Sequence, residues 1–252
     1  MPLLKAQGIV IKMVNLGEAD KIITLFTDSM GKIEAVAHGA RKPKSKLLSS
    51  TQIFCYGEYV LYKGKSLYTI SQAEIIQSFQ ELLNDLYTLT YGSYVVELIG
   101  VLTQNNEPNI ELFALLLKCM YLMTDRNIDI ELLIRAFELK SMSISGYMPN
   151  LYGCSCCKDK NAKPYGFSSQ SGGLVCKECF DSDGSAIKLD PSTIGLMRYI
   201  LKLDIEKVGM IKASKNNKYE MKKISKDYIK YYLDKEFKSL EFLDDIKNVD
   251  NL

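Results

Sequence analysis

The sequence has little of what several common functions require. His38 is its only histidine, so a histidine-dependent triad or a histidine-ligated catalytic metal has one candidate member. No apolar stretch approaches the roughly 18 residues of a transmembrane helix. The best candidate, residues 112–123, is shorter and contains Lys118. The first residues, MPLLKAQG, lack the apolar region of a signal peptide, so we expect no secretory signal.

Cysteine, by contrast, occurs in an informative pattern. Cys154 and Cys157 form one Cys-x-x-Cys pair, Cys176 and Cys179 form a second, and 18 residues separate the two pairs. This spacing is typical of two pairs that bind one zinc ion. Four thiolates would complete a closed tetrahedron without a position for water or substrate, which predicts a structural zinc ion. Cys156 offers another thiol, but only Cys154 and Cys157 repeat the spacing of the second pair.

Two alternatives for these cysteines are separate redox motifs and simple packing in a core. A redox motif would need a βαβ context, which the surrounding pattern lacks. Seven cysteines, four of them assigned to metal, are typical of a protein in a reducing compartment, and we expect a cytoplasmic location. Cys55 and Cys119 are expected to be small, buried apolar residues.

Charge is distributed unevenly along a chain whose net charge is +2. Residues 1–70 contain ten Lys/Arg and five Asp/Glu, residues 71–150 contain four and ten, and residues 151–252 contain eighteen and fifteen. A basic head followed by an acidic middle indicates different partners for different parts of the chain.

The first 77 residues have the pattern of a small β-barrel. Short segments rich in Ile, Val, Thr and Phe alternate with turn signals, and a longer loop separates the third segment from the fourth. Five such strands predict a closed barrel of the OB type, although an SH3-like barrel fits the same count. The expected strands span residues 7–14, 21–27, 32–37, 53–62 and 67–76.

After Ile76 the apolar residues recur at helical spacing. Asp129 and Asp190 are expected helix N-caps, the second followed by Pro191. The fold class is therefore α+β: an OB-type five-stranded barrel in residues 1–77, then an all-helical domain in residues 78–252 with a four-cysteine zinc finger embedded at about 150–182. The expected helices span residues 82–102, 110–123, 129–144, 190–203 and 219–237.

The loop between the third and fourth strands is a candidate contact with nucleic acid. Arg41, Lys42, Lys44 and Lys46 lie within six positions, in a loop that His38 precedes. Such a loop can place several cations along a phosphate backbone. The alternative is a solvated loop without a ligand. A second basic run on the last helix is more often an ordinary exposed face; it comprises Lys222, Lys223, Lys226 and Lys230.

An OB barrel can also offer aromatic side chains on which bases stack. About half of the candidates are expected to point inward and pack the core, because side chains alternate along a strand. The candidates are Phe26, Phe54, Tyr56, Tyr59, Tyr62 and Tyr68.

No catalytic constellation is recognisable, and we predict that the protein is not an enzyme. Gly64-Lys65-Ser66 resembles the end of a phosphate-binding P-loop, but the position that requires the first glycine is Tyr59. A hairpin turn explains this tripeptide. No set of residues supplies a nucleophile, a base and an oxyanion site together.

In their order along the chain, several segments carry a family resemblance. Taken singly, only the cysteine set is specific, but the combination is highly specific. The chain resembles the RecO family of bacterial DNA repair proteins across essentially its whole length. The segments are residues 8–11 (GIVI), 17–27 (GEADKIITLFT), 31–33 (GKI), 38–43 (HGARKP) and the four cysteines within a helical region.

The resemblance implies an OB domain followed by a helical domain with a zinc finger. It also implies a recombination mediator that binds single-stranded DNA, anneals complementary strands, and acts with RecR and single-strand DNA-binding protein to help load RecA. Such a protein is expected in the cytoplasm at the nucleoid, with no membrane partner. Predicted DNA contacts are Lys32, His38, Arg41, Lys42, Lys44, Lys46, Lys63 and Lys65.

We further expect the acidic, hydrophobic C-terminal tail of single-strand DNA-binding protein to bind the helical region. Such a tail needs an apolar groove edged by cations, for which the candidates are Lys118, Arg126, Arg135 and Lys140. Residues 191–252 are an alternative source of cations. Two other functional classes stay open at this point: a zinc-containing nucleic-acid-processing enzyme, such as a nuclease or nucleotidyl transferase, and a transcription or translation adaptor.

Overall fold

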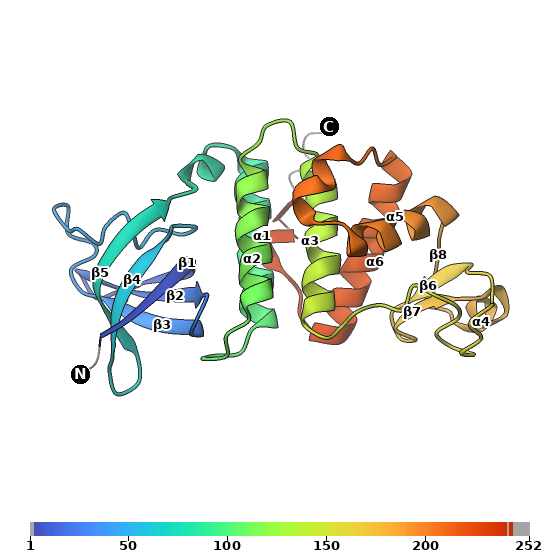
Figure 1. Cartoon of the computed structure of the whole chain (residues 1–252), viewed down its shortest axis with the longest axis horizontal. Coiled ribbons are helices and arrows are strands. Elements are labelled where there is room, and N and C mark those ends of the chain that lie inside the picture. The colour runs from blue at the N-terminus through green and yellow to red at the C-terminus, as the bar shows by residue number, and fades with distance from the viewer. Residues whose placement is uncertain (1–2, 241, 244–252) are drawn as a thin grey trace. The chain divides into compact units, whose positions relative to one another are not determined.

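The computed structural model of the chain describes residues 3–240 and 242–243 (Figure 1). The first five strands close into a barrel of order β1-β2-β3-β5-β4, in which β1 pairs with both β2 and β4, and β3 runs parallel to β5. The predicted OB-type barrel is thus confirmed. Its strands are β1 (Leu3–Leu16), β2 (Asp20–Thr27), β3 (Gly31–Ala37), β4 (Tyr56–Lys63) and β5 (Tyr68–Gln77).

The two largest differences from the predicted strand boundaries, at the starts of β1 and β4, arise from long-range pairing. β1 begins at Leu3 because its first half pairs with β4, from Leu3 opposite Tyr62 onward. β4 begins at Tyr56, not at residue 53. The N–H of Phe54 donates to the Val10 carbonyl at 2.9 Å, so residues 53–55 close the preceding loop against β1. Both contacts join residues that are more than 40 positions apart, so the spacing of apolar and turn residues within each strand does not predict them.

The barrel interior is filled by side chains that alternate along the strands. Tyr59 is fully buried, and its hydroxyl donates to the carbonyl oxygen of Ser50 at 2.7 Å, which ties the long loop to the core. Cys55 is fully buried too, as predicted. The remaining buried members of this core are Val10, Ile23, Leu25, Ile33, Ala35, Ala37, Ala40, Leu61 and Ile70.

Two long helices follow the barrel: α1 (Leu86–Leu102) and α2 (Ile110–Met123), after a short 3₁₀ helix, η1 (Gln80–Asn84). The predicted helix over 82–102 is divided, because the carboxylate of Asp85 accepts the Thr88 N–H at 2.8 Å and caps a new helix there. α2 has the predicted bounds, and Cys119 within it is fully buried.

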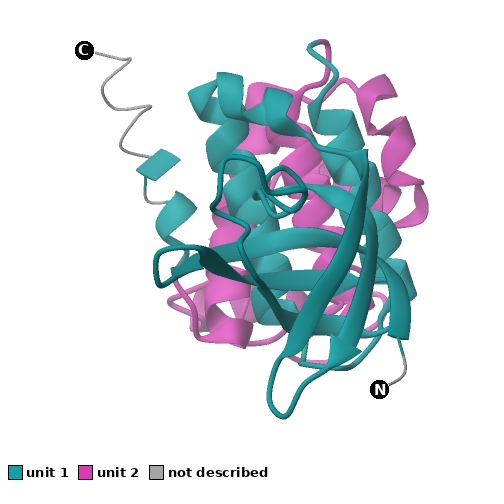
Figure 2. Ribbon diagram, turned by 90° about the vertical axis from the view of Figure 1, so that its left-hand side faces the viewer, with its two compact units in different colours: residues 1–126, 237–252 teal, residues 127–236 magenta. Residues whose placement is uncertain are grey.

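These helices pack with the barrel in one compact unit, which comprises the described residues of 1–126 and 237–252 (Figure 2). Phe113 of α2 meets Phe26 edge to face, with ring centroids 5.7 Å apart. Phe54 lies against α1 where a glycine leaves room: a Cβ on Gly92 would lie only 3.2 Å from the Phe54 ring.

The second compact unit, residues 127–236, contains the cysteine module, which lies beside the helices and is inserted between two of them in the sequence (Figure 1). Asp129 and Asp190 cap α3 and α5, as predicted. α6 begins four residues before the predicted start, because Ser214 and Asn217 form a capping box. Its elements are α3 (Ile130–Ile144), β6 (Gly166–Ser168), β7 (Gly173–Val175), α4 (Lys177–Ser182), β8 (Ile187–Lys188), α5 (Pro191–Lys202), η2 (Ile205–Met210) and α6 (Lys215–Leu233).

A helix that crosses a lipid bilayer needs about 20 predominantly apolar residues. Over the described residues 3–240 and 242–243, no helix combines the length and apolar character needed to cross a membrane.

Candidate metal centre and nucleic-acid interface

The four predicted ligands converge on one point. The Sγ atoms of Cys154, Cys157, Cys176 and Cys179 all lie within 4.8 Å of one another. Zn–S bonds of about 2.3 Å would place tetrahedral corners about 3.8 Å apart, so the four thiols are close to coordination spacing. The residues therefore fit a metal ion held by four thiolates.

Local backbone geometry explains how the first pair is presented. Gly153 has φ +67°, and a Cβ there would lie 2.7 Å from the carbonyl oxygen of Asp159. This close approach lets the Cys154 N–H donate to that carbonyl at 2.8 Å and forms a tight turn around the first two thiols. The second pair lies at the start of α4, where Cys176 is the N-cap.

The environment of Cys154 favours its thiolate. Burial opposes ionisation, but backbone N–H groups of Cys176, Cys157 and Cys156 outweigh it and lower the pKa of the Cys154 thiol to about 6. The Cys176 N–H lies 3.3 Å from this sulfur. A thiolate is the metal-binding form of cysteine, so this environment suits a metal ligand.

The hairpin between the pairs is confirmed. β6 and β7 pair antiparallel, with Phe167 opposite Leu174, and both side chains are buried. Cys156 is exposed and is not among the four clustered thiols. The thiols thus group as the recurrent spacing predicted.

The basic loop extends from β3 with its cations exposed. Arg41, Lys42, Lys44 and Lys46 are all exposed in the segment between β3 and β4. Lys63 and Lys65 are likewise exposed at the end of the β4–β5 hairpin. Six of the eight predicted DNA contacts are therefore solvent-accessible lysines or arginines of the barrel.

Asp20, which sequence reasoning missed, fixes the base of this loop. Its carboxylate accepts the Gly39 N–H at 2.7 Å and lies 2.7 Å from Nδ1 of His38. The Gly39 N–H, and then the His38 ring, lower the pKa of the Asp20 carboxyl. Arg41 adds two contacts to the same β1–β2 turn: its N–H donates to the Ala19 carbonyl and its guanidinium to the Gly17 carbonyl.

Lys32, a predicted DNA contact, has two intramolecular acceptors instead. Its ammonium donates to the carbonyl oxygens of Gly100 and Thr103, each at 2.6 Å. These carbonyls lie at the C-terminal end of α1, where a cation compensates the helix dipole. Burial lowers the pKa of this lysine. Lys32 therefore connects the barrel to α1 and lies outside the exposed basic surface.

Most candidate stacking aromatics are buried. Phe26, Phe54 and Tyr59 are fully buried, and Tyr56 is 8% exposed. Tyr62 and Tyr68 are half-buried. The expectation that half would point inward underestimated their burial, because α1 and α2 cover an outer face of the barrel as well.

The four predicted partner-binding cations do not share one environment. Arg126 is exposed, whereas Lys118 and Lys140 are half-buried. Arg135 is 3% exposed, and its guanidinium pairs with Glu138 at 2.9 Å. As an edge of a surface groove, Arg135 is therefore a poor candidate: its charge is already compensated inside the unit.

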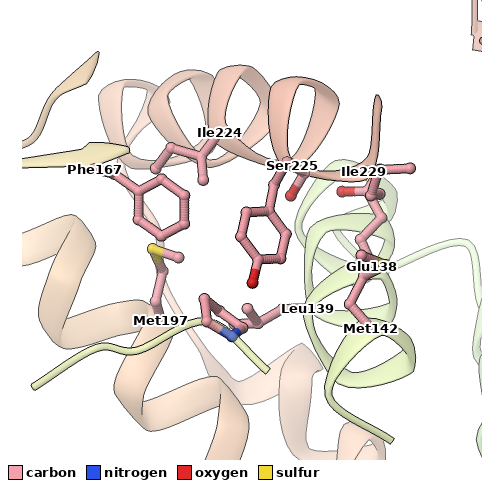
Figure 3. A pocket seen from close by; sticks show the side chains of 10 residues that line it. Glu138, Leu139, Met142, Phe167, Met197, Ile224, Ser225 and Ile229 are labelled. Carbon is pink, nitrogen blue, oxygen red and sulfur yellow. The ribbon is translucent and has the colours of Figure 1, made fainter. Parts of the chain in front are cut away.

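An apolar pocket does lie in the second unit, between α3, α5 and α6 (Figure 3). Its cavity volume is ≈ 20 Å³. Glu138 and Ser225 are the polar members of the lining. The other lining residues are Leu139, Met142, Pro149, Phe167, Met197, Ile224, Tyr228 and Ile229.

Comparison with known proteins covers both parts of the chain. The family model described as Recombination protein O N terminal matches residues 1–79, and that described as Recombination protein O C terminal matches residues 83–241. A DNA repair protein RecO from Clostridium acetobutylicum is 42% identical over 248 residues, which cover 98% of this chain and 99% of that protein.

Two further relatives give the same result. A DNA repair protein RecO from Alkaliphilus metalliredigens is 39% identical over 240 residues, covering 95% of this chain and 98% of that protein. One from Acetivibrio thermocellus is 35% identical over 252 residues, covering 100% and 99%. The barrel, the cysteine centre and both family matches lead to one conclusion. The chain belongs to the RecO family of DNA repair proteins.

Proposed function

We propose that this protein binds single-stranded DNA through its barrel, anneals complementary strands, and helps to load RecA together with RecR on DNA covered by single-strand DNA-binding protein. The observation that carries the proposal is the cluster of exposed cations on one loop of an OB barrel in a RecO-family chain. The protein would act in the cytoplasm, at the nucleoid, as a mediator without catalytic chemistry of its own.

The physical basis is neutralisation of phosphates. Arg41, Lys42, Lys44 and Lys46 form the principal contact, with His38, Lys63 and Lys65 as additional positive groups. Each phosphate contact releases counterions, so binding is independent of sequence and weakens with salt. Two strands held near one positive surface repel each other less, and their pairing then needs no nucleotide cofactor.

Zinc is the metal we propose for the cysteine centre. Cys154, Cys157, Cys176 and Cys179 would hold it, and a closed four-thiolate shell gives it a structural role. The chain's own residues fix the ligand positions: the turn after Gly153 orients the first pair and the start of α4 orients the second. The centre would link the β6–β7 hairpin to α4.

For the tail of single-strand DNA-binding protein we propose the pocket region of the second unit. The pocket supplies apolar contacts for a hydrophobic end group. On α6, Lys222 and Lys226 lie three residues before the lining residues Ser225 and Ile229, so each shares a helix face with one of them. Charge from this helix replaces the contribution first expected from Arg135.

An annealing assay tests the main proposal. Complementary single strands, one of them coated with single-strand DNA-binding protein, should pair faster with this protein than without it, in the absence of ATP and divalent metal. No acceleration, together with no binding to bare single strands at low salt, would refute the proposed function. A metal-dependent change in DNA length would instead support a nuclease or nucleotidyl transferase, and binding confined to a particular duplex sequence would support an adaptor.

A separate titration tests the tail site. A tail peptide should bind the full-length protein and dissociate as salt increases. Replacing Lys222 and Lys226 with glutamine should weaken the peptide but leave affinity for bare DNA nearly intact. Arg126→Gln, at one of the positions first considered for the tail, is the control for location, because it removes a single exposed cation from the other compact unit. Equal loss in the control would contradict the proposed location.

A further inference from the structure

Five of the six Phe and Tyr rings in residues 3–77 pack against the barrel core or against α1 and α2. Three of them belong to the contact with the helices of the same unit: Phe26 and Tyr56 meet the ring of Phe113, at 5.7 and 6.3 Å between centroids, and Phe54 packs against Gly92. Their faces are therefore covered by α1 and α2. A nucleic-acid base cannot stack on them unless these helices separate from the barrel.

The other three rings occupy different positions. Tyr59 fills the barrel core, and Tyr68 packs against the same core from its edge. Tyr62 lies on β4, opposite Thr69 of β5, and is half-buried. Among the Phe and Tyr residues in 3–77, Tyr62 alone is both outside the core and away from α1 and α2. His38 is the other exposed ring, and its Nδ1 is held by Asp20.

Aliphatic residues, not aromatic ones, lie on the outer face of β1, β2 and β3, where rings would be needed for base stacking next to the basic loop. Val14, Ile22 and Val36 lie directly opposite one another on β1, β2 and β3, so they share the outer face. Val14 is 48% exposed, and Ile22 and Val36 are half-buried. This strip ends beside Asp20 and His38, where the basic loop begins. The surface next to Arg41, Lys42, Lys44 and Lys46 is thus mainly branched and aliphatic. The rings near the cations are His38, whose Nδ1 is held by Asp20, and the half-buried Tyr62, which directly precedes Lys63.

We propose that the barrel holds a single DNA strand by its phosphates and leaves the bases unstacked from protein, with their pairing edges free. This inference rests on the proposed function and specifies which part of the DNA is recognised. A base that stacks on an aromatic ring must leave that ring before it can pair and stack within a new duplex. Phosphate contacts alone hold the strand without that competition. The recognised ligand is therefore a flexible polyphosphate chain, whatever its bases.

The test compares two oligonucleotides of equal length and charge, an oligothymidylate and an abasic strand with the same number of phosphates. Both should bind the full-length protein with affinities within about threefold, because the phosphate term is the same for both. Their slopes of log affinity against log salt should also agree. On a stacking surface, each lost base–ring contact would cost about fivefold or more.

If the affinities of the two oligonucleotides differ, two further measurements identify the side chain that contacts the bases. Tyr62→Leu should leave oligothymidylate affinity unchanged, with circular dichroism to confirm the fold. A strand containing 2-aminopurine should keep or gain fluorescence on binding, since contact with a tyrosine ring would quench it. Quenching that Tyr62→Leu abolishes would show that Tyr62 stacks on a base.

The outcomes separate this inference from the proposed function. If oligothymidylate binds and the abasic strand binds about tenfold more weakly or worse, bases contribute and the inference is wrong while the function stands. If neither strand binds at low salt, the proposed function itself fails. Equal binding of both strands with unquenched 2-aminopurine supports the inference.

Discussion

Arg41 in the barrel and Arg135 in the second unit carry the same charge in opposite surroundings. Arg41 lies in an exposed loop, with its guanidinium directed to the Gly17 carbonyl. Arg135 is 3% exposed and pairs with Glu138 inside its unit. An arginine in water remains available to a diffusing anion, whereas a buried one is already desolvated and paired. The comparison shows that a count of cations along a sequence does not measure the charge that a partner meets.

The same contrast holds for lysines. Lys218 of α6 pairs with Asp129 at 2.8 Å, and Lys32 donates to two carbonyl oxygens of α1. Lys42, Lys44 and Lys46, in contrast, are exposed on a loop with no acidic residue. The second unit has more cations in total, yet the barrel places four of its exposed ones within six positions of one loop. This concentration is what favours the barrel as the DNA-binding part.

The largest expected effect comes from the cysteine centre, which belongs to the second unit and not to the barrel. Structural zinc sites contribute an apparent free energy of about 10–16 kcal/mol near neutral pH. Loss of one ligand in Cys176→Ser should therefore release the metal and unfold at least the cysteine module. Metal analysis and thermal unfolding would measure this.

Cys156→Ser is the matched control for that experiment, because it removes an exposed thiol two residues from Cys154 that lies outside the four-thiol cluster. It should retain one zinc per chain and the parent thermal stability. Protein purified without chelators that contains no zinc would contradict the assignment. So would full zinc retention after both Cys176 and Cys179 are changed to serine.

The second prediction concerns the buried ion pair. Arg135→Met removes the guanidinium that pairs with the buried Glu138 carboxylate, and breaking such a pair costs about 3–5 kcal/mol. Arg126→Met, at an exposed position, should change the free energy of unfolding by no more than about 0.5 kcal/mol. Urea unfolding of both variants measures the difference.

A double variant sharpens the result. Replacing both partners, as in Arg135→Met with Glu138→Leu, removes the uncompensated charge and should recover most of the lost stability. Binding of bare single-stranded DNA should be normal in the double variant. Reduced DNA binding there, with stability restored, would show that Arg135 is available to DNA after all and that the comparison with Arg41 is mistaken.

The third prediction concerns the basic loop. Four phosphate contacts correspond to a single-strand salt slope of about −2.8, or about a 50-fold loss of affinity between 50 and 200 mM salt. Replacing Arg41, Lys42, Lys44 and Lys46 with glutamine should remove most of this slope without unfolding the protein. Fluorescence anisotropy with a labelled oligonucleotide measures both quantities.

An equal change of charge on α6 provides the control. Glutamine at Lys222, Lys223, Lys226 and Lys230 should leave the slope nearly unchanged, because we place the principal DNA contact on the barrel. If the two quadruple variants exchange these results, the DNA-binding surface lies on α6. The comparison between the units would then be reversed.

Local signals in the sequence predicted much of this structure. The caps Asp129 and Asp190 and the repeated cysteine spacing each depend on residues a few positions apart, and all were found where expected. Contacts between distant segments were missed, because they depend on how strands and helices pack. Phe26 against Phe113, which covers a candidate stacking ring, is one example, and Asp20 against His38 is another.

The smallest predicted effect tests whether the affinity of the basic loop for DNA depends on the fixed position of the loop or only on its charge. Asp20→Ala deletes a negative charge beside the basic loop, so charge alone predicts tighter DNA binding. It also deletes the contacts of the carboxylate with Gly39 and His38, so the base of the loop keeps the Arg41 contacts but loses this anchor. Ordering rotamer-rich side chains costs about 0.5–1.5 kcal/mol each on binding. We therefore expect a weaker complex, by about 2- to 12-fold.

Glu18→Ala is the matched control, because Glu18 is an exposed carboxylate in the same β1–β2 turn and lies two residues from Asp20. It should bind DNA as tightly as the parent or slightly more tightly. Because the folded pKa of Asp20 is lowered, its contribution to stability is present above the unfolded pKa near 4 and is lost as the pH falls through the folded value. The free energy of unfolding, measured as a function of pH, should therefore be higher for the parent than for Asp20→Ala above about pH 4. This difference should disappear once the pH is below the folded pKa of Asp20. Tighter DNA binding by Asp20→Ala would show that the loop needs no anchor and that its charge alone determines the affinity.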